Sequence, residues 1–137
     1  MVNEFSGIMQ KQRDFYRTGI TRSFKFRKDQ IKKFRSAIKK NESMLYEALH
    51  ADLKKSAFES YGTEIGPTLS ESRFILNHLK EWMQPVHVPG MLFSFPSRGT
   101  ILSEPYGSAL IISPWNYPVW LSLVPWLELW LRAIALS

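Results

Sequence analysis

The chain has 137 residues, enough for one domain with a buried core, and its composition of 45% hydrophobic and 22% charged residues is that of an ordinary globular protein. It contains no cysteine, which excludes disulfides, cysteine-ligated metals and catalysis by a cysteine of its own. The net charge of +6 is unevenly spread: residues 1–40 hold twelve Lys and Arg against three Asp and Glu, or +9, so the other 97 residues carry −3.

Helical spacing predicts two helices in this basic part of the chain. At helical spacing, one face holds Ile8, Gln12, Phe15 and Tyr16, and Thr18-Gly19 ends the first helix. Residues 20–26 are irregular, and a second helix begins near Arg27. Its apolar stripe consists of Ile31, Phe34 and Ile38.

Two further helices are expected before residue 85. Asn41 can cap the third helix. The apolar residues of that helix, at intervals of four, are Leu45, Leu49 and Leu53. Ser56 and Glu59 fit a capping box at the start of the fourth helix, and Pro67 is expected to kink or divide it because proline cannot donate a backbone hydrogen bond. The apolar stripe of the fourth helix consists of Ile65, Leu69, Leu76, Leu79 and Met83.

Aromatic residues are interleaved with the basic residues of the first 40 positions. These residues are Phe15, Phe24, Phe26 and Phe34. Such a pattern can indicate a surface that binds nucleic acid or an anionic membrane. A basic helical nucleic-acid-binding protein, or a small membrane-associated protein that uses its Trp-rich tail, is therefore the alternative function. We favour a solvated basic face, because the apolar spacing already gives these rings a role in the core.

After Trp82 the chain is predicted to be extended, with a short strand over residues 100–103. Helix is excluded there by Pro85, Pro89, Gly90 and Pro96. A buried strand that ends in a rigid loop follows. Residues 109–112 form an apolar run without polar alternation, which is typical of a parallel sheet covered on both sides. In open α/β sheets, ligands collect at the carboxyl end of such a strand.

The loop after this strand reads Pro114-Trp115-Asn116-Tyr117-Pro118 and resembles the aldehyde dehydrogenase superfamily. The class 3 branch, which acts on fatty and medium-chain aldehydes, is the most similar. Other segments that resemble this branch are 52–56, 63–65, 79–85 and 93–97. The resemblance extends from the first helix to Pro125.

This resemblance implies roles for the residues of the loop. In the family, the loop Asn donates its side-chain amide to the oxygen of the thiohemiacetal formed from the aldehyde, and that residue is Asn116 here. The cofactor, NAD or NADP, is expected to contact Ile112, Ser113, Pro114 and Trp115. Tyr117 is assigned to the substrate pocket. An isolated Asn in such a turn would more often bond only to backbone, but the complete pentapeptide favours the catalytic role.

The implied fold class is α/β, an N-terminal helical layer plus the incomplete start of a Rossmann-like NAD(P)-binding domain. Residues 1–85 are the helical part of that domain, 86–105 an extended segment with an oligomerisation strand, and 106–125 the first strand-loop-helix of the dinucleotide-binding core. The implied function is that of an N-terminal fragment of an enzyme that oxidises an aldehyde to a carboxylate. We expect the chain alone to be inactive, since the family's cysteine nucleophile and glutamate base are absent.

Residues 126–137 depart from the family pattern, which continues roughly as Pro-Leu-Val-Gly-Ala-Val-Ala-Ala-Gly-Asn. Permissible codons for this tail, read from the third base of the Trp126 codon, encode Val-Gly-Ala-Val-Ala-Ala-Gly-Asn-Cys-Ala-Val. We therefore interpret residues 126–137 as an out-of-frame tail produced by a single-base slip near Trp126. A selected amphipathic tail with a Glu128/Arg132 pair is the alternative.

The remaining expectations concern partners, metals and location. The parent enzyme is expected to be a homodimer that takes an aldehyde and binds no nucleic acid. No membrane span is expected, because Pro125, Glu128 and Arg132 interrupt the apolar stretch over residues 119–136. The three histidines are well separated, so no metal site is expected. Residues 1–12 lack the features of a signal peptide, and the cytoplasm is the expected compartment.

Overall fold

The computed structural model describes residues 2–90, 93, 97–102, 107–131 and 135–136. Helices dominate it. They are α1 (Val2–Arg17), the 3-10 helix η1 (Ile20–Arg22), α2 (Phe24–Lys40), α3 (Glu42–Leu53), α4 (Ala57–Ser60), the π-helix η2 (Tyr61–Ile65), α5 (Gly66–Trp82) and α6 (Pro118–Leu131). The strands are β1 (Val86–Pro89), β2 (Arg98–Ile101), β3 (Ser108–Ala109) and β4 (Ala135–Leu136).

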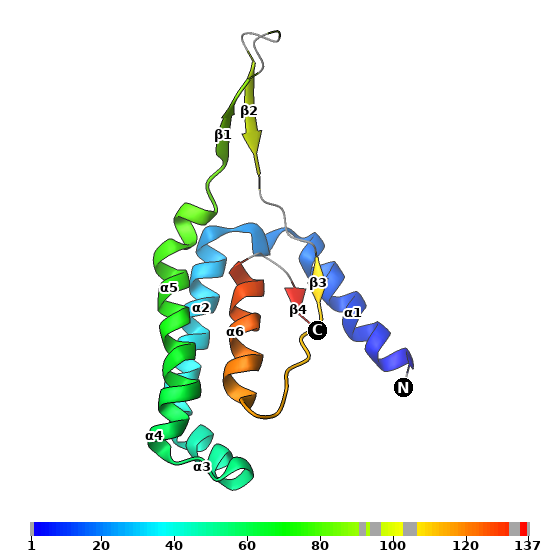
Figure 1. Ribbon diagram of the computed structural model, residues 1–137. Helices are drawn as coiled ribbons and strands as arrows, with labels where there is room; N and C mark the ends of the chain where they lie inside the picture. Colours follow the sequence, from blue (N-terminus) through cyan, green and yellow to red (C-terminus); the bar gives the residue numbers. More distant parts are fainter. Residues whose placement is uncertain (1, 91–92, 94–96, 103–106, 132–134, 137) are drawn as a thin grey trace.

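Helices α2, α5 and α6 lie side by side and enclose the core (Figure 1). One buried cluster consists of Ile31, Ile75, Leu79 and Leu127. A second consists of Ile38, Ile65 and Leu69. The predicted stripes of the second and fourth helices supply most of these side chains, so the helical spacing identified the core faces correctly. The predicted helical layer and the α/β fold class are confirmed.

Helix α2 begins earlier than expected, at Phe24 rather than near Arg27. The Ser23 hydroxyl caps it by accepting a hydrogen bond from the backbone N–H of Phe26 (3.4 Å). Phe24 and Phe34 pack against the first core cluster. Two of the four aromatic residues among the basic ones therefore pack against the core as expected, whereas Phe15 is 43% exposed.

Asn41 does not cap the third helix with its side chain, so this expectation was wrong. Its amide instead donates to the carbonyl oxygen of Ala37 (2.8 Å), at the end of α2. The last carbonyls of a helix need partners as much as the first N–H groups do, and an Asn between two helices can serve either end. The Ser56 hydroxyl does accept from the Glu59 N–H (3.1 Å), which is one half of the predicted capping box.

Pro67 marks a division in the fourth helix, as predicted. The chain passes from α4 through the π-helix η2 into α5, and Pro67 occupies the first turn of α5. Proline has no N–H to donate, and its ring would clash with the carbonyl of Thr63 in a regular α-helix. A wider turn before Pro67 relieves that clash and leaves Glu64 and Ile65 buried.

Strands β1 and β2 form an antiparallel hairpin that projects away from the helices (Figure 1). Val86 pairs with Ile101, and Pro89 pairs with Arg98. The strand predicted over residues 100–103 thus begins earlier and ends at Ile101, while Ser103 lies outside the described residues.

The buried strand predicted over residues 109–112 was wrong for this chain. Strand β3 covers only Ser108–Ala109 and pairs in parallel with β4, Ser108 opposite Ala135. Beyond it, Leu110 is 71% exposed and Ile112 is 85% exposed. A strand is buried on both faces only where neighbouring strands and covering helices surround it. In the described part of the chain, β3 pairs with a single strand, the two-residue β4.

Helix α6 continues past Pro125 into the divergent tail and ends at Leu131. Leu127 is 0% exposed, and Trp126 stacks on Phe34 with 4.8 Å between ring centroids. The described part of the tail therefore packs against α2. Among the described residues, none of the helices combines the length and hydropathy needed to cross a membrane.

Candidate functional site

The loop of residues 110–117 runs from β3 to helix α6 and carries all the residues assigned to the site. Its first half is anchored through Ser113, whose hydroxyl lies 2.7 Å from the hydroxyl of Ser122 on α6. Ser122 in turn donates to the carbonyl oxygen of Pro118 (2.5 Å). These contacts hold the start of the loop against the first turns of the helix that follows it.

A buried ion pair holds the second half of the loop. Lys55 Nζ lies 2.6 Å from Glu64 Oε1, and the two residues are 8% and 0% exposed. Lys55 follows α3, and Glu64 lies in the π-helix η2. Lys55 Nζ also donates to the backbone carbonyl of Asn116 (3.0 Å) and lies 3.9 Å from the centroid of the Tyr117 ring.

The other oxygen of Glu64 caps helix α6. Glu64 Oε2 accepts from the backbone N–H of Val119 (2.8 Å) and, more weakly, from that of Trp120 (3.4 Å). The first N–H groups of a helix have no partner within the helix, and the helix dipole favours a negative charge at this end. A carboxylate from a different helix therefore takes the place of a local capping residue.

Asn116 has an anchored backbone and an exposed side chain. Among the described residues, no hydrogen bond engages its side-chain amide. The alternative that Asn116 only bonds to backbone within its own turn receives no support from these contacts. Tyr117 is half-buried, with its ring beside the Lys55 ammonium and edge-on to Trp120 at 6.3 Å between centroids.

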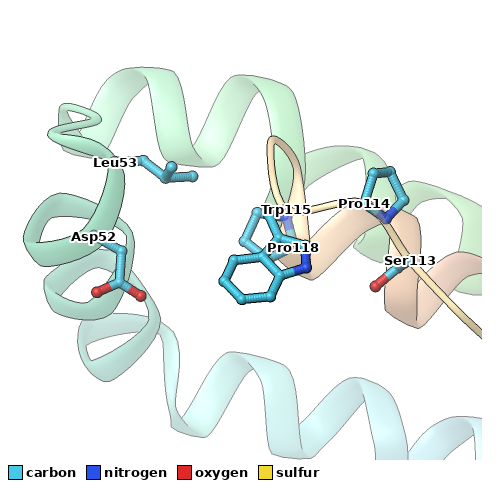
Figure 2. A pocket seen from close by; sticks show the side chains of 6 residues that line it. All are labelled: Asp52, Leu53, Ser113, Pro114, Trp115 and Pro118. Atoms are coloured by element: carbon cyan, nitrogen blue, oxygen red, sulfur yellow. The ribbon is translucent and has the colours of Figure 1, made fainter.

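A cavity of about 560 Å³ lies between this loop and the end of α3. It is lined by Asp52, Leu53, Ser113, Pro114, Trp115 and Pro118. In Figure 2, the Leu53 side chain points across the cavity toward Trp115 and Pro118. The cavity thus brings together three of the four residues assigned to cofactor binding. Ile112, Asn116 and Tyr117 do not line it.

The loop can present one amide donor and an exposed indole to a ligand. Trp115 is 85% exposed, and Asn116 follows it directly. Among the described residues, no group of three or more His, Cys, Asp or Glu side chains could hold a metal ion. The arrangement therefore offers hydrogen bonding and stacking.

Two residues that position this loop were not identified from the sequence. Lys55 and Glu64 both lie in segments that resemble class 3 aldehyde dehydrogenases. This resemblance was the only feature of the sequence that could have indicated their importance. Their mutual contact was not predictable from spacing, because Lys55 lies outside the regular helices and Glu64 lies in a π-turn.

Comparison with known proteins places this geometry in a family. The profile of the aldehyde dehydrogenase family matches residues 7–128. The 4,4'-diaponeurosporen-aldehyde dehydrogenase of Staphylococcus aureus is 44% identical over 111 residues, covering 81% of this chain and 24% of that protein. Aldehyde dehydrogenase family 3 member F1 of Arabidopsis thaliana is 38% identical over 117 residues, covering 85% of this chain and 24% of that protein.

A solved structure agrees with these matches. The substrate-bound state of Staphylococcus aureus AldH superposes with a TM-score of 0.93 at 37% identity, covering 96% of this chain and 29% of that chain. The present chain thus spans about a quarter of the length of the curated relatives it matches. The relatives include members of family 3, so the predicted class 3 resemblance is confirmed. Together, the loop geometry and these matches establish that the chain belongs to the aldehyde dehydrogenase family.

Proposed function

We propose that this chain provides the oxyanion donor and part of the cofactor wall of an NAD(P)-dependent aldehyde dehydrogenase, which converts an aldehyde to a carboxylate. The observation that carries the proposal is the state of Asn116, whose backbone carbonyl is held by Lys55 while its side chain is exposed. A fixed backbone with a free amide suits a donor that must meet a substrate oxygen.

The chemistry favours an amide at this position. Negative charge develops on the aldehyde oxygen when a nucleophile attacks the carbonyl, and a preorganised N–H donor stabilises that charge more than it stabilises the ground state. Loss of one such donor costs about 10²–10³ in kcat. Asn116 is the proposed donor, and Tyr117 is the proposed substrate-pocket residue beside it.

The residues before Asn116 fit one part of a nicotinamide cofactor. Ile112 and Trp115 expose apolar surface, and the cavity beside the loop is lined in part by Ser113, Pro114 and Trp115. An apolar surface next to a cavity suits the flat nicotinamide ring. When bound, NAD or NADP accepts a hydride from the substrate. The Gly-rich loop that commonly cradles phosphates is not evident in this sequence, so other residues would have to bind the phosphates.

The chain by itself is proposed to be inactive. The family resemblance implies a cysteine nucleophile and a glutamate general base, and this chain contains no cysteine. Orientation of a substrate by Asn116 cannot replace the covalent step.

Residues 126–137 are proposed to be an out-of-frame tail. With permissible codons, one C inserted directly before the Trp126 codon makes the gene read Pro-Leu-Val-Gly-Ala-Val-Ala-Ala-Gly-Asn from Pro125 onward, which is the family pattern. The packing of Leu127 and Trp126 is compatible with this proposal, because any helix with apolar residues at these positions can cover α2 and α5.

The finer partner assignments are also proposals. Membership of the aldehyde dehydrogenase family supports an aldehyde as the substrate of the parent enzyme. We propose that the parent enzyme is a homodimer in the cytoplasm. The alternative of nucleic-acid binding receives no support from the family match. Phe24 and Phe34, which could have stacked on bases, instead pack against the core.

Restoring the reading frame tests the proposal. The product of the gene with the inserted base is expected to be longer and to reduce NAD or NADP in the presence of an aldehyde, whereas the 137-residue chain is expected to show no turnover above buffer. A stop codon directly after the insertion, or a folded but inert product, would contradict the proposal. Turnover by the 137-residue chain would contradict the expected inactivity.

A further inference from the structure

The buried pair formed by Lys55 and Glu64 joins segments that are far apart in the sequence. Lys55 lies 61 residues before Asn116, and Glu64 lies 55 residues before Val119. Both polar ends of the pair reach the loop and the start of α6, which carry the proposed site. The pair therefore does more than join η2 to the segment after α3.

An ion pair that served stability alone would not need this arrangement. Removing two charges from water is costly, and buried ion pairs can often be replaced by apolar residues without loss of stability. Here each partner has a second contact with the backbone of the loop or helix. Lys55 holds the Asn116 carbonyl, and Glu64 holds the Val119 N–H.

These two contacts bracket a short piece of chain. The carbonyl of Asn116 is held on one side, the N–H of Val119 is held on the other, and Pro118 between them has a nearly fixed φ angle. Tyr117 is held by its ring against the Lys55 ammonium. The direction in which the Asn116 side chain leaves the backbone is thereby determined.

We propose that Lys55 and Glu64 are positioning residues that set the orientation of Asn116. The role in catalysis rests on the proposed function, while the positioning itself is a property of this chain. An oxyanion donor has to sit within a few tenths of an ångström of its productive place, and small misplacements of catalytic groups can cost about 10²-fold in rate. A charged clamp in a buried site provides such a restraint.

The experiment uses the complete 137-residue chain and separates stability from positioning. Four variants are compared with the original: Lys55→Met, Glu64→Leu, the double variant with both changes, and Asp14→Leu/Arg17→Met. The last variant is the matched control, since it also removes one positive and one negative charge. These belong to an ion pair on the exposed surface of α1, in which a guanidinium nitrogen of Arg17 lies 3.3 Å from Asp14 Oδ1. The readouts are the urea midpoint, the hydrogen-exchange rates of the Val119 and Trp120 amides, and the NMR resonances of the Asn116 backbone and side-chain amide.

We expect both single variants to lower the urea midpoint, because each leaves one buried charge without its partner. The double variant should recover most of that midpoint. In the double variant, the hydrogen-exchange rate of the Val119 amide should nevertheless be at least tenfold higher than in the original chain. The Asn116 resonances should shift or broaden. The control should leave the exchange rates and these resonances unchanged.

A double variant that keeps the original Val119 exchange rate and Asn116 resonances would overturn the proposal, as the pair would then be purely structural. If the double variant does not fold, Glu64→Asp provides the test. This variant keeps the negative charge, but its side chain is one methylene shorter, so the carboxylate no longer reaches the Val119 N–H. Faster Val119 exchange in Glu64→Asp supports positioning, and unchanged exchange overturns it. None of these readouts involves an aldehyde or a cofactor, so failure of this proposal is distinguishable from failure of the proposed function.

Discussion

Leu127→Ala tests most directly whether residues beyond Pro125 belong to the fold. The Leu127 side chain is 0% exposed and packs with Ile31, Ile75 and Leu79, which come from α2 and α5. Burial of a leucine side chain contributes about 1.5–3 kcal/mol, and the cavity left by truncation raises the cost of Leu→Ala in a core to about 2–5 kcal/mol. Because three helices meet at this point and cannot all move inward, we expect a loss of about 3 kcal/mol.

Urea unfolding followed by far-UV circular dichroism measures this loss. For a small protein, the free energy of unfolding falls by about 1–3 kcal/mol per molar urea, so a loss of about 3 kcal/mol lowers the midpoint by about 1–3 M. Leu110→Ala is the matched control, since the same chemical change occurs at a side chain that is 71% exposed. The control should change the free energy of unfolding by no more than about 0.5 kcal/mol.

Equal midpoints for Leu127→Ala and Leu110→Ala would refute this reasoning. Such a result would mean that α6 beyond Pro125 does not contribute to the core, and that the burial of Leu127 has no energetic consequence. It would also remove the argument that an out-of-frame sequence can be accommodated by packing.

Three other predictions follow from the structure. Gly66→Ala should destabilise the chain by about 1–3 kcal/mol, because the added Cβ would lie 2.8 Å from the carbonyl oxygen of Tyr61. Gly62→Ala should be neutral or stabilising by up to about 1 kcal/mol, because a Cβ at this position meets open space. Thermal unfolding of both variants checks this difference in sign. Burial, with a hydrogen bond from the Tyr46 hydroxyl to Glu42, raises the pKa of Tyr46 to about 12. The unfolded chain therefore loses this proton first, so the stabilising contribution of Tyr46 is complete below about pH 10 and is lost as the pH rises toward 12. Phenolate absorbance should show a late titration step in the original chain, and its persistence in Tyr46→Phe would assign that step elsewhere. In the product of the frame-restored gene, Asn116→Ala should lower kcat by about 10²–10³ and leave cofactor binding nearly unchanged, which steady-state kinetics and cofactor titration measure; an equal loss in both would argue against the oxyanion role.

Local sequence patterns predicted the main helices, the core faces of α2 and α5, and the identity of the loop. Ile31 and Ile38 recur at helical spacing, and this spacing alone indicates which face of α2 is buried, whatever packs against it. The loop from Pro114 to Pro118 is recognisable because its pentapeptide resembles that of aldehyde dehydrogenases, and its two prolines restrict the backbone locally. The division of the fourth helix at Pro67 follows equally from the chemistry of one residue.

Tertiary structure alone decided the partners of these faces and the state of the charged residues. In sequence, Lys55 and Glu64 look like any other solvated charges, and only the approach of η2, the end of α3 and the start of α6 makes them a buried clamp on Asn116. The exposure of Leu110 and Ile112 could not be predicted either. An apolar run favours burial, but it is buried only if other strands and helices of the folded chain cover it. Spacing along the chain encodes which side of an element is apolar, whereas contacts between residues 55 and 116 depend on how the whole chain packs.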